Sequence, residues 1–206
     1  EGIGADAHLM IDAGTIFHED VEAAAARLQA LSDANVLWYE EPFDAAALAS
    51  YGELAKRTPK VKLAGGEGAH NPFQAEHLID HGGVGFVQID TGYIGGIGDA
   101  YRVAQYAKAR GVQFVNHTFT SHSALSASLQ PFAGLKDSWI TEYPMEPKSL
   151  CVELTVDKIE VESDGMITIP DRPGIGLEIN LAAVKKYLVE TEIKVGGKVL
   201  YTTPTV

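Results

Sequence analysis

Short apolar runs alternate along the chain with longer segments in which apolar residues recur every three or four positions. The short runs are AHLMI (7–11), VLWY (36–39), VKLAG (61–65), GFVQI (85–89), VQFVN (112–116) and SWIT (138–141). Nearly continuous apolar runs of this length are typical of strands buried on both faces of a parallel sheet. The segments between them are rich in Ala and Leu and predict helices at 21–32, 45–57, 73–82, 97–111 and 121–134.

Strand and helix alternate without a hairpin signal, which predicts parallel strands joined by helical crossovers. The first ionisable side chain suited to chemistry after each run follows at intervals of 28, 27, 23, 27 and 25 residues: Asp12, Glu40, Glu67, Asp90, His117 and Glu142. In a closed barrel of parallel strands these positions converge at one mouth, whereas an open doubly wound sheet would spread them along an edge. We therefore expect an α/β fold, a TIM-type (β/α) barrel that is incomplete, with about six strand–helix units.

The last quarter of the chain has a different pattern. Apolar and polar residues alternate around Ser163-Asp164-Gly165, which predicts a hairpin, and a loop, a short helix over 181–190 and a polar tail follow. We expect a partial barrel domain over 1–149 that carries the metal and catalytic residues. Residues 150–206 are expected to form a closing segment of hairpin, loop, helix and tail.

Charge and cysteine content narrow the classes of partner. The formal net charge is −12, from 28 acidic against 16 basic residues, which disfavours nucleic acid and anionic membranes. A single cysteine, Cys151, excludes an internal disulfide and fits a reducing, cytoplasmic compartment. No apolar run approaches the roughly 20 residues that a membrane span needs.

Three carboxylates follow the first three predicted strands. Asp12, Glu40 and Glu67 would repel one another at a common mouth unless a cation lay between them, and oxygen-only ligands select Mg²⁺, with Mn²⁺ as a second possibility. A single acid at a strand end is more often a helix cap or a solvated turn. Three at near-constant spacing favour a metal site. Glu41 is expected to point away from it, because adjacent strand residues face opposite sides.

An acid and an imidazole follow in the next two units. A carboxylate such as Asp90 beside His117 would fix the tautomer of the ring and raise its basicity, as a general base requires. The alternative for His117 is a capping or core histidine. Glu142 could be held protonated near other carboxylates and donate a hydrogen bond to a developing oxyanion. His122 is expected to begin a helix and to face solvent.

The ordered motifs resemble the barrel domain of the enolase superfamily, in its mandelate racemase-like subgroup. The resemblance covers nearly the whole chain, through MIDAG (10–14), WYEEP (38–42), AGGEG (64–68), VQIDTGYIGGIGDA (87–100), NHTFTSH (116–122), TEYP (141–144) and IPDRPGIGLEIN (169–180). It implies that Asp12, Glu40 and Glu67 bind Mg²⁺. It also implies that the Asp90–His117 dyad moves the α-proton of a carboxylate substrate, with Glu142 near the enolate oxygen.

The resemblance implies a lyase that dehydrates an acid sugar, an aldonate or aldarate. The alternatives are a racemase or epimerase of a 2-hydroxy acid and, in another class, a non-catalytic half-barrel or truncated fragment. A family barrel has eight strands, and the units absent here precede Asp12 and include the one that usually carries a second base. We therefore expect the chain to need the missing N-terminal capping and barrel portion, and to form a homo-oligomer as family members commonly do.

Overall fold

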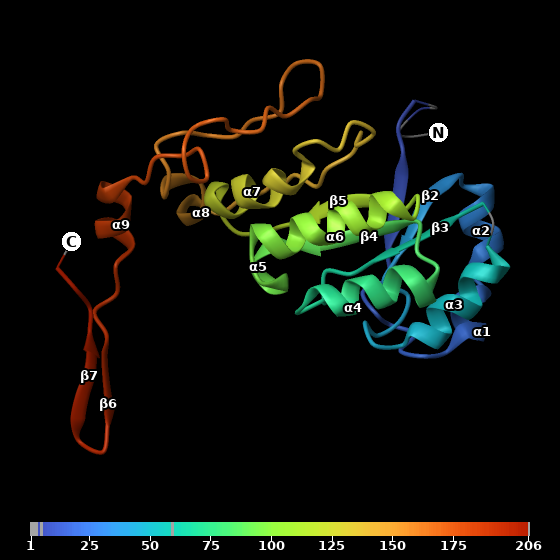
Figure 1. Cartoon of the computed structure of the whole chain (residues 1–206), viewed down its shortest axis with the longest axis horizontal. Helices are drawn as coiled ribbons and strands as arrows, with labels where there is room; N and C mark the ends of the chain where they lie inside the picture. Colours follow the sequence, from blue (N-terminus) through green and yellow to red (C-terminus); the bar gives the residue numbers. More distant parts are fainter. Residues whose placement is uncertain (1–3, 5, 59, 206) are drawn as a thin grey trace. The chain divides into compact units, whose positions relative to one another are not determined.

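The computed structural model describes residues 4, 6–58 and 60–205. Five parallel strands form one sheet in sequential order, and they are β1 (Leu9–Asp12), β2 (Val36–Glu40), β3 (Lys62–Gly65), β4 (Phe86–Asp90) and β5 (Gln113–His117). The sheet curls into an incomplete (β/α) barrel, as expected from the sequence (Figure 1). Its register sets Asp12 opposite Glu40 and Asp90 opposite His117, so that functional side chains meet at the carboxyl ends of neighbouring strands.

Helices connect successive strands. Before β5 they are α1 (Val21–Ala25), α2 (Leu28–Asp33), α3 (Leu48–Arg57), α4 (Pro72–His77), the π-helix η1 (Leu78–Gly82), α5 (Thr91–Ile94) and α6 (Ile97–Ala109). After β5 come α7 (His122–Leu129), the 3₁₀-helix η2 (Gln130–Phe132), α8 (Ser149–Glu153) and α9 (Leu181–Tyr187). Side chains of Asp20 and Asn71 accept hydrogen bonds from the first turns of α1 and α4, which satisfies amides that have no partner within the helix. None of the helices in the described part of the chain is long and apolar enough to cross a bilayer.

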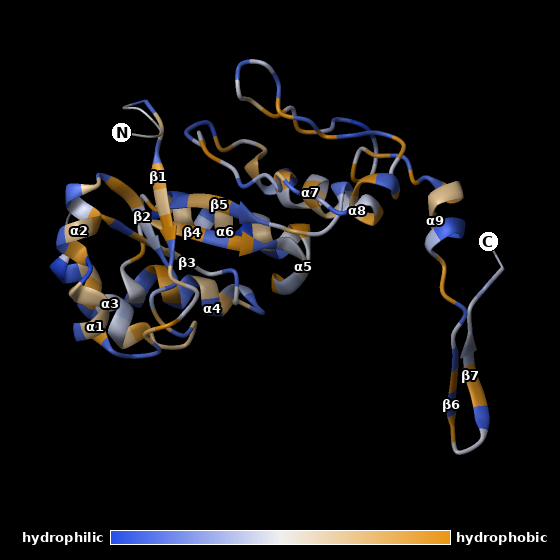
Figure 2. Cartoon of the chain, turned by 180° about the vertical axis from the view of Figure 1, so that it is seen from behind, coloured by the Kyte–Doolittle hydropathy of each residue, from blue (hydrophilic) through white to orange (hydrophobic). Residues whose placement is uncertain are grey.

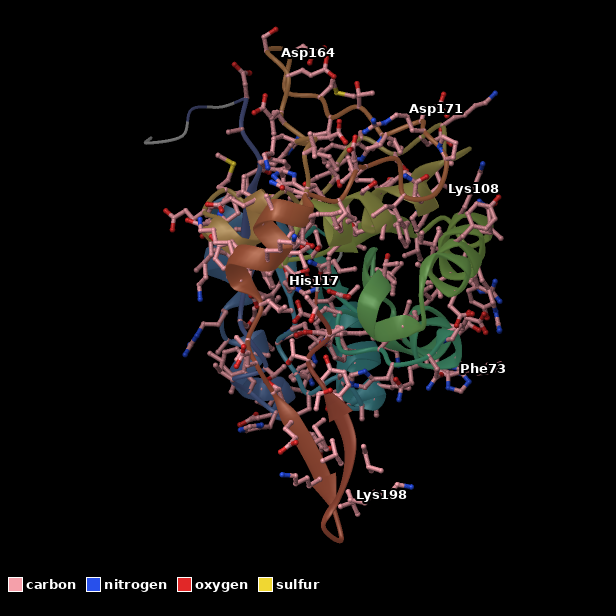
Figure 3. The ribbon with its side chains drawn as sticks, turned by 90° about the vertical axis from the view of Figure 1, so that its left-hand side faces the viewer. Phe73, Lys108, His117, Asp164, Asp171 and Lys198 are labelled. Atoms are coloured by element: carbon pink, nitrogen blue, oxygen red, sulfur yellow. The ribbon has the colours of Figure 1, made fainter. Side chains whose placement is uncertain are left out.

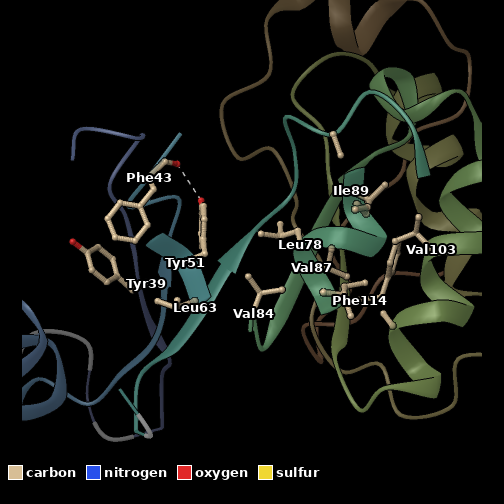
Figure 4. Packing of buried hydrophobic residues seen from close by; sticks show 14 of the residues in the cluster. Tyr39, Phe43, Tyr51, Leu63, Leu78, Val84, Val87, Ile89, Val103 and Phe114 are labelled. Carbon is tan, nitrogen blue, oxygen red and sulfur yellow. Dashed lines mark hydrogen bonds between the residues drawn. The ribbon is translucent and has the colours of Figure 1, made fainter. Parts of the chain in front are cut away.

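Residues of the strands pack on both faces of the sheet. Val87, Ile89 and Phe114 lie on the outer face and pack against the helices, where Tyr51 donates a hydrogen bond to the Phe43 carbonyl (Figure 4). The inner face carries a smaller apolar layer of Trp38, Ala64, Phe86 and Val115. Figure 2 shows hydrophobic residues running through the strands of this sheet. The strands are therefore buried on two sides, which explains their continuous apolar runs.

The prediction of a sixth strand at 138–141 is wrong. These residues form no strand in the described part of the chain. The Asn116 side chain of β5 binds the backbone of the residue that follows them. Its amide donates to the Glu142 carbonyl at 3.1 Å and its oxygen accepts from the Glu142 amide at 3.0 Å. Glu142 is thus held beside β5 by a side chain rather than by strand pairing.

The chain divides into two compact units. The first comprises 1–118 and 127–142, and the second comprises 119–126 and 143–206. In the second unit, the ring of His122 accepts a hydrogen bond from the Ile159 amide at 3.1 Å, which ties the start of α7 to the later segment. His122 begins the helix as expected, but it is buried, so the expectation that it faces solvent is wrong.

The hairpin lies farther along the chain than expected. Around Ser163-Asp164-Gly165 there is a turn without a ladder, whereas β6 (Glu192–Val195) and β7 (Lys198–Thr202) form an antiparallel pair. Gly196 and Gly197 connect them with φ of 57° and 79°. Two consecutive residues with positive φ match the twist of a tight hairpin, and glycine adopts that conformation without a Cβ penalty.

Candidate active site

The sequence-predicted residues of the first unit gather at the carboxyl ends of its parallel strands. Asp12, Glu40, Asp90 and His117 are the last residues of β1, β2, β4 and β5, and Glu67 follows β3 by two residues. Parallel strands bring these ends to the same rim of the sheet. The rim therefore combines four carboxylates and one imidazole from separate strand–helix units.

His117 lies between two of these carboxylates. Its Nδ1 is 2.9 Å from Oδ2 of Asp90, and its Nε2 is 3.1 Å from Oε2 of Glu67. The side chain, labelled in Figure 3, is only 4% exposed. A ring that is buried and contacted at both nitrogens is fixed in orientation, which is the geometry that a general base needs.

Asp90 has a second role at the start of α5. Its Oδ1 accepts hydrogen bonds from the amides of Gly92, at 2.7 Å, and Tyr93, at 3.1 Å. The two oxygens of one carboxylate are thus divided between the helix cap and His117. The regular spacing of ionisable residues singled out Asp90 in the sequence. Its position as the N-cap of α5 gives a structural reason for an acid at the end of this strand.

Glu40 is buried on the inner face of the sheet. The indole Nε1 of Trp38 donates to its Oε2 at 3.0 Å. Burial raises the pKa of Glu40 to about 7, against a hydrogen bond from Gln88. The negative charges of Glu142 and Asp12 raise it further. The raised pKa of Glu40 therefore reflects its burial first and the neighbouring acids second.

The three predicted metal ligands have the carboxylate oxygens that Mg²⁺ prefers. No group of three His, Cys, Asp or Glu side chains among the described residues is arranged to hold a metal ion. Each candidate has another contact: Glu40 accepts from Trp38, Glu67 contacts His117, and Asp12 accepts from the Gly14 amide at 2.7 Å.

Glu142 connects to the same network through a glutamine. Gln88 Nε2 donates to Glu142 Oε1 at 2.9 Å, and the Gln88 side chain is fully buried on the inner face of β4. Burial raises the pKa of Glu142, while the hydrogen bond from Gln88 and the charge of His117 oppose this. A raised pKa favours the protonated form, which can donate a hydrogen bond.

Glu41 lies on the opposite side of the strand from Glu40. Its Cγ would lie 3.6 Å from a Cβ placed on Gly65, which also faces the hydroxyl of Tyr51 on the outer side. Its backbone has φ of 36°, in the left-handed region that non-glycine residues rarely adopt. Burial raises the pKa of Glu41 to about 7, with the charge of Glu67 as the next cause. The Cγ of Glu41 thus lies on the side of Tyr51, while the charges of Glu67, Asp12 and His117 still act on its carboxyl.

Sequence reasoning missed Gln88, Asn116 and Trp38. The signal for two of them is a polar amide inside an otherwise apolar strand, in FVQID and QFVNH. A buried amide requires hydrogen-bond partners, so such a residue predicts polar neighbours from other segments. Among the described atoms, Gln88 Oε1 is buried without a hydrogen-bond partner. This orphaned acceptor next to Glu142 marks a polar interior at the rim.

A family model and several curated relatives match this chain. Residues 1–183 match the model of a family described as enolase C-terminal domain-like. A D-galactarolactone cycloisomerase from Agrobacterium fabrum is 28% identical over 195 residues, which cover 91% of this chain and 50% of that protein. A D-galactonate dehydratase from Xanthomonas campestris is 33% identical over 85% of this chain and 48% of its own length. The chain spans about half the length of the curated relatives it matches.

Solved structures agree in fold. A protein from Rhodobacter sphaeroides described as a predicted mandelate racemase aligns with a TM-score of 0.94 and 57% identity, over 100% of this chain and 52% of that one. The 3,6-anhydro-D-galactonate cycloisomerase from Zobellia galactanivorans aligns with a TM-score of 0.80 and 26% identity, over 90% and 52%.

Proposed function

The chain belongs to the enolase C-terminal domain-like family, and on this premise we propose that it carries out the removal of the α-proton of a carboxylate substrate. The observation that carries the proposal is the position of His117, buried and held between Asp90 at 2.9 Å and Glu67 at 3.1 Å. The α-proton of a carboxylate is weakly acidic, so its removal needs an oriented base and compensation of the charge that develops.

His117 is the base in this proposal. Asp90 holds Nδ1 and thereby leaves Nε2 as the atom that receives the proton. Burial of the ring excludes water that would compete for it. Nε2 now faces Glu67, so a substrate entering the site takes the place of this contact.

Mg²⁺ held by Asp12, Glu40 and Glu67 would supply the positive charge that stabilises the developing ene-diolate. The support for this ligand set is its carboxylate chemistry and the register that sets Asp12 opposite Glu40 at the ends of β1 and β2. Glu142, in its protonated form, donates a hydrogen bond to a substrate oxygen in this proposal. Gln88 keeps that carboxyl in place.

The substrate class that we propose is an acid sugar, an aldonate or aldarate, which the enzyme dehydrates. Loss of the proton from C2 leaves an electron pair that expels the hydroxyl at C3, and His117 returns a proton so that water leaves. The resulting enol tautomerises to a 2-keto-3-deoxy acid. Relatives named as galactonate and arabinonate dehydratases support this class.

A racemase or epimerase of a 2-hydroxy acid is the second candidate. It is supported by the 57% identity to a protein described as a predicted mandelate racemase. Such a reaction needs a second base on the other face of the substrate. Incorporation of solvent deuterium at the α-carbon without loss of water would favour it over dehydration.

The experiment for the reaction class uses the full-length enzyme with Mg²⁺ and a panel of aldonates and aldarates. We expect 2-keto-3-deoxy products from at least one acid, and none from the His117→Gln variant. A panel that gives neither products nor α-deuterium exchange would contradict the proposal.

The experiment for the metal is calorimetric titration with Mg²⁺. We expect Glu40→Gln to weaken binding at least tenfold, because it removes a charged ligand. Glu53→Gln, which changes an exposed glutamate on α3, is the matched control and should leave the affinity unchanged. Equal affinity in the Glu40→Gln variant and the unchanged protein would reject the ligand assignment, and absence of binding in both would reject the metal.

A further inference from the structure

Tyr93 is a large aromatic side chain left open to solvent at the rim of the sheet. It belongs to α5, three residues after Asp90, and is 56% exposed. The centroid of its ring is 6.4 Å from that of His117, with 36° between the ring planes. An exposed tyrosine next to a buried base is available for contact with whatever the base acts on.

The position of Tyr93 relative to the base is fixed through a shared carboxylate. Asp90 accepts from the Tyr93 amide at 3.1 Å and from the Gly92 amide at 2.7 Å with one oxygen. Its other oxygen contacts His117 at 2.9 Å. Asp90 therefore holds both the turn that carries Tyr93 and the ring of His117.

A second ring lies next to that of Tyr93. The centroid of His70 lies 6.0 Å from that of Tyr93, and His70 is exposed. Its amide donates to Gln74 Oε1 at 2.7 Å, which fixes the loop between Glu67 and α4. His70 after β3, Tyr93 after β4 and His117 at the end of β5 thus form a row along the rim in the order of the strands.

The row matches the length and chemistry of an acid sugar. Beyond its α-carbon such a molecule continues through several C–C bonds of about 1.5 Å, so its hydroxylated end reaches past His117 toward the next ring. A phenol offers an apolar face to C–H groups and a hydroxyl that can donate or accept, and a neutral imidazole offers one donor and one acceptor. Polar groups placed in this way determine orientation and specificity in small-molecule sites.

We infer that Tyr93, with His70, forms the wall of the substrate site that contacts the distal hydroxyl groups and determines the chain length of the acid accepted. This inference rests on the proposed α-proton abstraction and adds a specificity-determining residue to it. Tyr93 acts on the part of the substrate remote from the reacting carbon. Removal of the Tyr93 ring should therefore raise KM for long substrates more than it changes KM or kcat for short ones.

The test compares Tyr93→Ala and Tyr93→Phe in the full-length enzyme, using four-, five- and six-carbon aldonates. For Tyr93→Ala we expect KM for six-carbon acids to rise at least tenfold while values for four-carbon acids change less than threefold. Tyr93→Phe should show a smaller rise, because it loses only the hydroxyl. His70→Ala is a second variant, which should shift the same ratio. Tyr101→Ala changes another exposed tyrosine, 44% exposed on α6, and should leave both values unchanged.

The outcomes separate this inference from the proposed function. If the unchanged enzyme converts acids and both Tyr93→Ala and His70→Ala keep its kcat/KM ratio between six- and four-carbon acids, the inference is overturned and the function stands. If the unchanged enzyme neither converts any acid nor exchanges an α-proton with deuterated solvent, the proposed function fails and the inference fails with it. Thermal melting of each variant shows whether a change in KM comes from the site or from unfolding.

Discussion

At the scale of single residues, Asp90 joins local structure to chemistry. The same carboxylate caps α5 and contacts His117, so the constraint that ends strand β4 also orients the base. A change at this position can therefore act on the helix start and on the ring at once. The isosteric amide separates the two, because its oxygen can still accept from the backbone amides while its charge is lost.

Asp90→Asn is expected to lower kcat by about 10²–10⁴, since an uncharged partner no longer stabilises a protonated ring or fixes its tautomer. The measurement is turnover of the acid that the full-length enzyme uses, with thermal melting to show that the fold persists. Asp33→Asn, which changes a helix-surface aspartate that accepts from Gln29, serves as the control. Full activity in Asp90→Asn would remove the orienting role of this carboxylate.

His122 is expected to make stability depend on pH. Burial lowers the pKa of His122, and the nearby charge of Lys158 lowers it further. The folded state therefore prefers the neutral ring, which accepts from the Ile159 amide. Its contribution is present above the unfolded pKa of about 6.5 and is lost as the pH falls below that value.

Urea unfolding at pH 8 and pH 5.5 tests this dependence. The His122→Gln variant keeps a hydrogen-bond acceptor but does not titrate, so its midpoint should fall less between the two pH values. An identical fall in the variant and the unchanged chain would contradict the role of His122.

At the scale of elements, the closeness of α3 and η1 depends on a missing side chain. A Cβ on Gly52, in the middle of α3, would lie 2.5 Å from the His81 carbonyl oxygen. The backbone of His81 cannot move away from such a Cβ as easily as a flexible side chain could. The helix therefore contains glycine, a poor helix former, because the packing of two elements requires it.

Gly52→Ala is expected to destabilise the chain by about 1–3 kcal/mol, because steric overlap outweighs the gain in helix propensity. Gly98→Ala is the matched control, since a Cβ there meets nothing within 4 Å on α6. It should stabilise by roughly 0.5–1 kcal/mol. Chemical denaturation of both variants measures the change in the free energy of unfolding, which should be a loss for Gly52→Ala and a gain for Gly98→Ala. Stabilisation by both substitutions would show that α3 and η1 are not in tight contact.

At the scale of the whole molecule, the sheet presents two edges. In the order β1-β2-β3-β4-β5 the outer strands β1 and β5 each pair on one side. Met10, opposite Trp38 on the inner face, is 38% exposed. Unpaired strand edges beside apolar surface favour association with another chain.

The 206-residue chain alone is therefore expected to self-associate, and Met10→Lys should reduce this association by placing a charge on the inner face. Sedimentation velocity over a range of concentrations measures the effect. Ile16→Lys adds the same charge at a loop residue that is more exposed, and it should leave association unchanged. A monomer at every concentration would contradict the prediction.

The fold followed from the sequence where local pattern and burial agree. The five runs that became β1 to β5 are apolar enough to require burial on two faces, and the Ala-rich segments between them become helices. The run at 138–141 has the same pattern but forms no strand, and the next residue, Glu142, is bound through its backbone by the Asn116 side chain. A contact made by one side chain leaves no periodic signal in the sequence.

The sequence by itself determined the order of parallel strands and which ionisable residues end them, because periodicity and strand length are local properties. Only the tertiary structure decided the contacts among those residues: His117 between Asp90 and Glu67, Gln88 bound to Glu142, and Tyr93 beside the base. Such contacts, and the burial that raises the pKa of Glu40, depend on distances of a few ångströms between segments far apart in the chain. Spacing along a sequence places residues at a common rim but does not determine which of them touch.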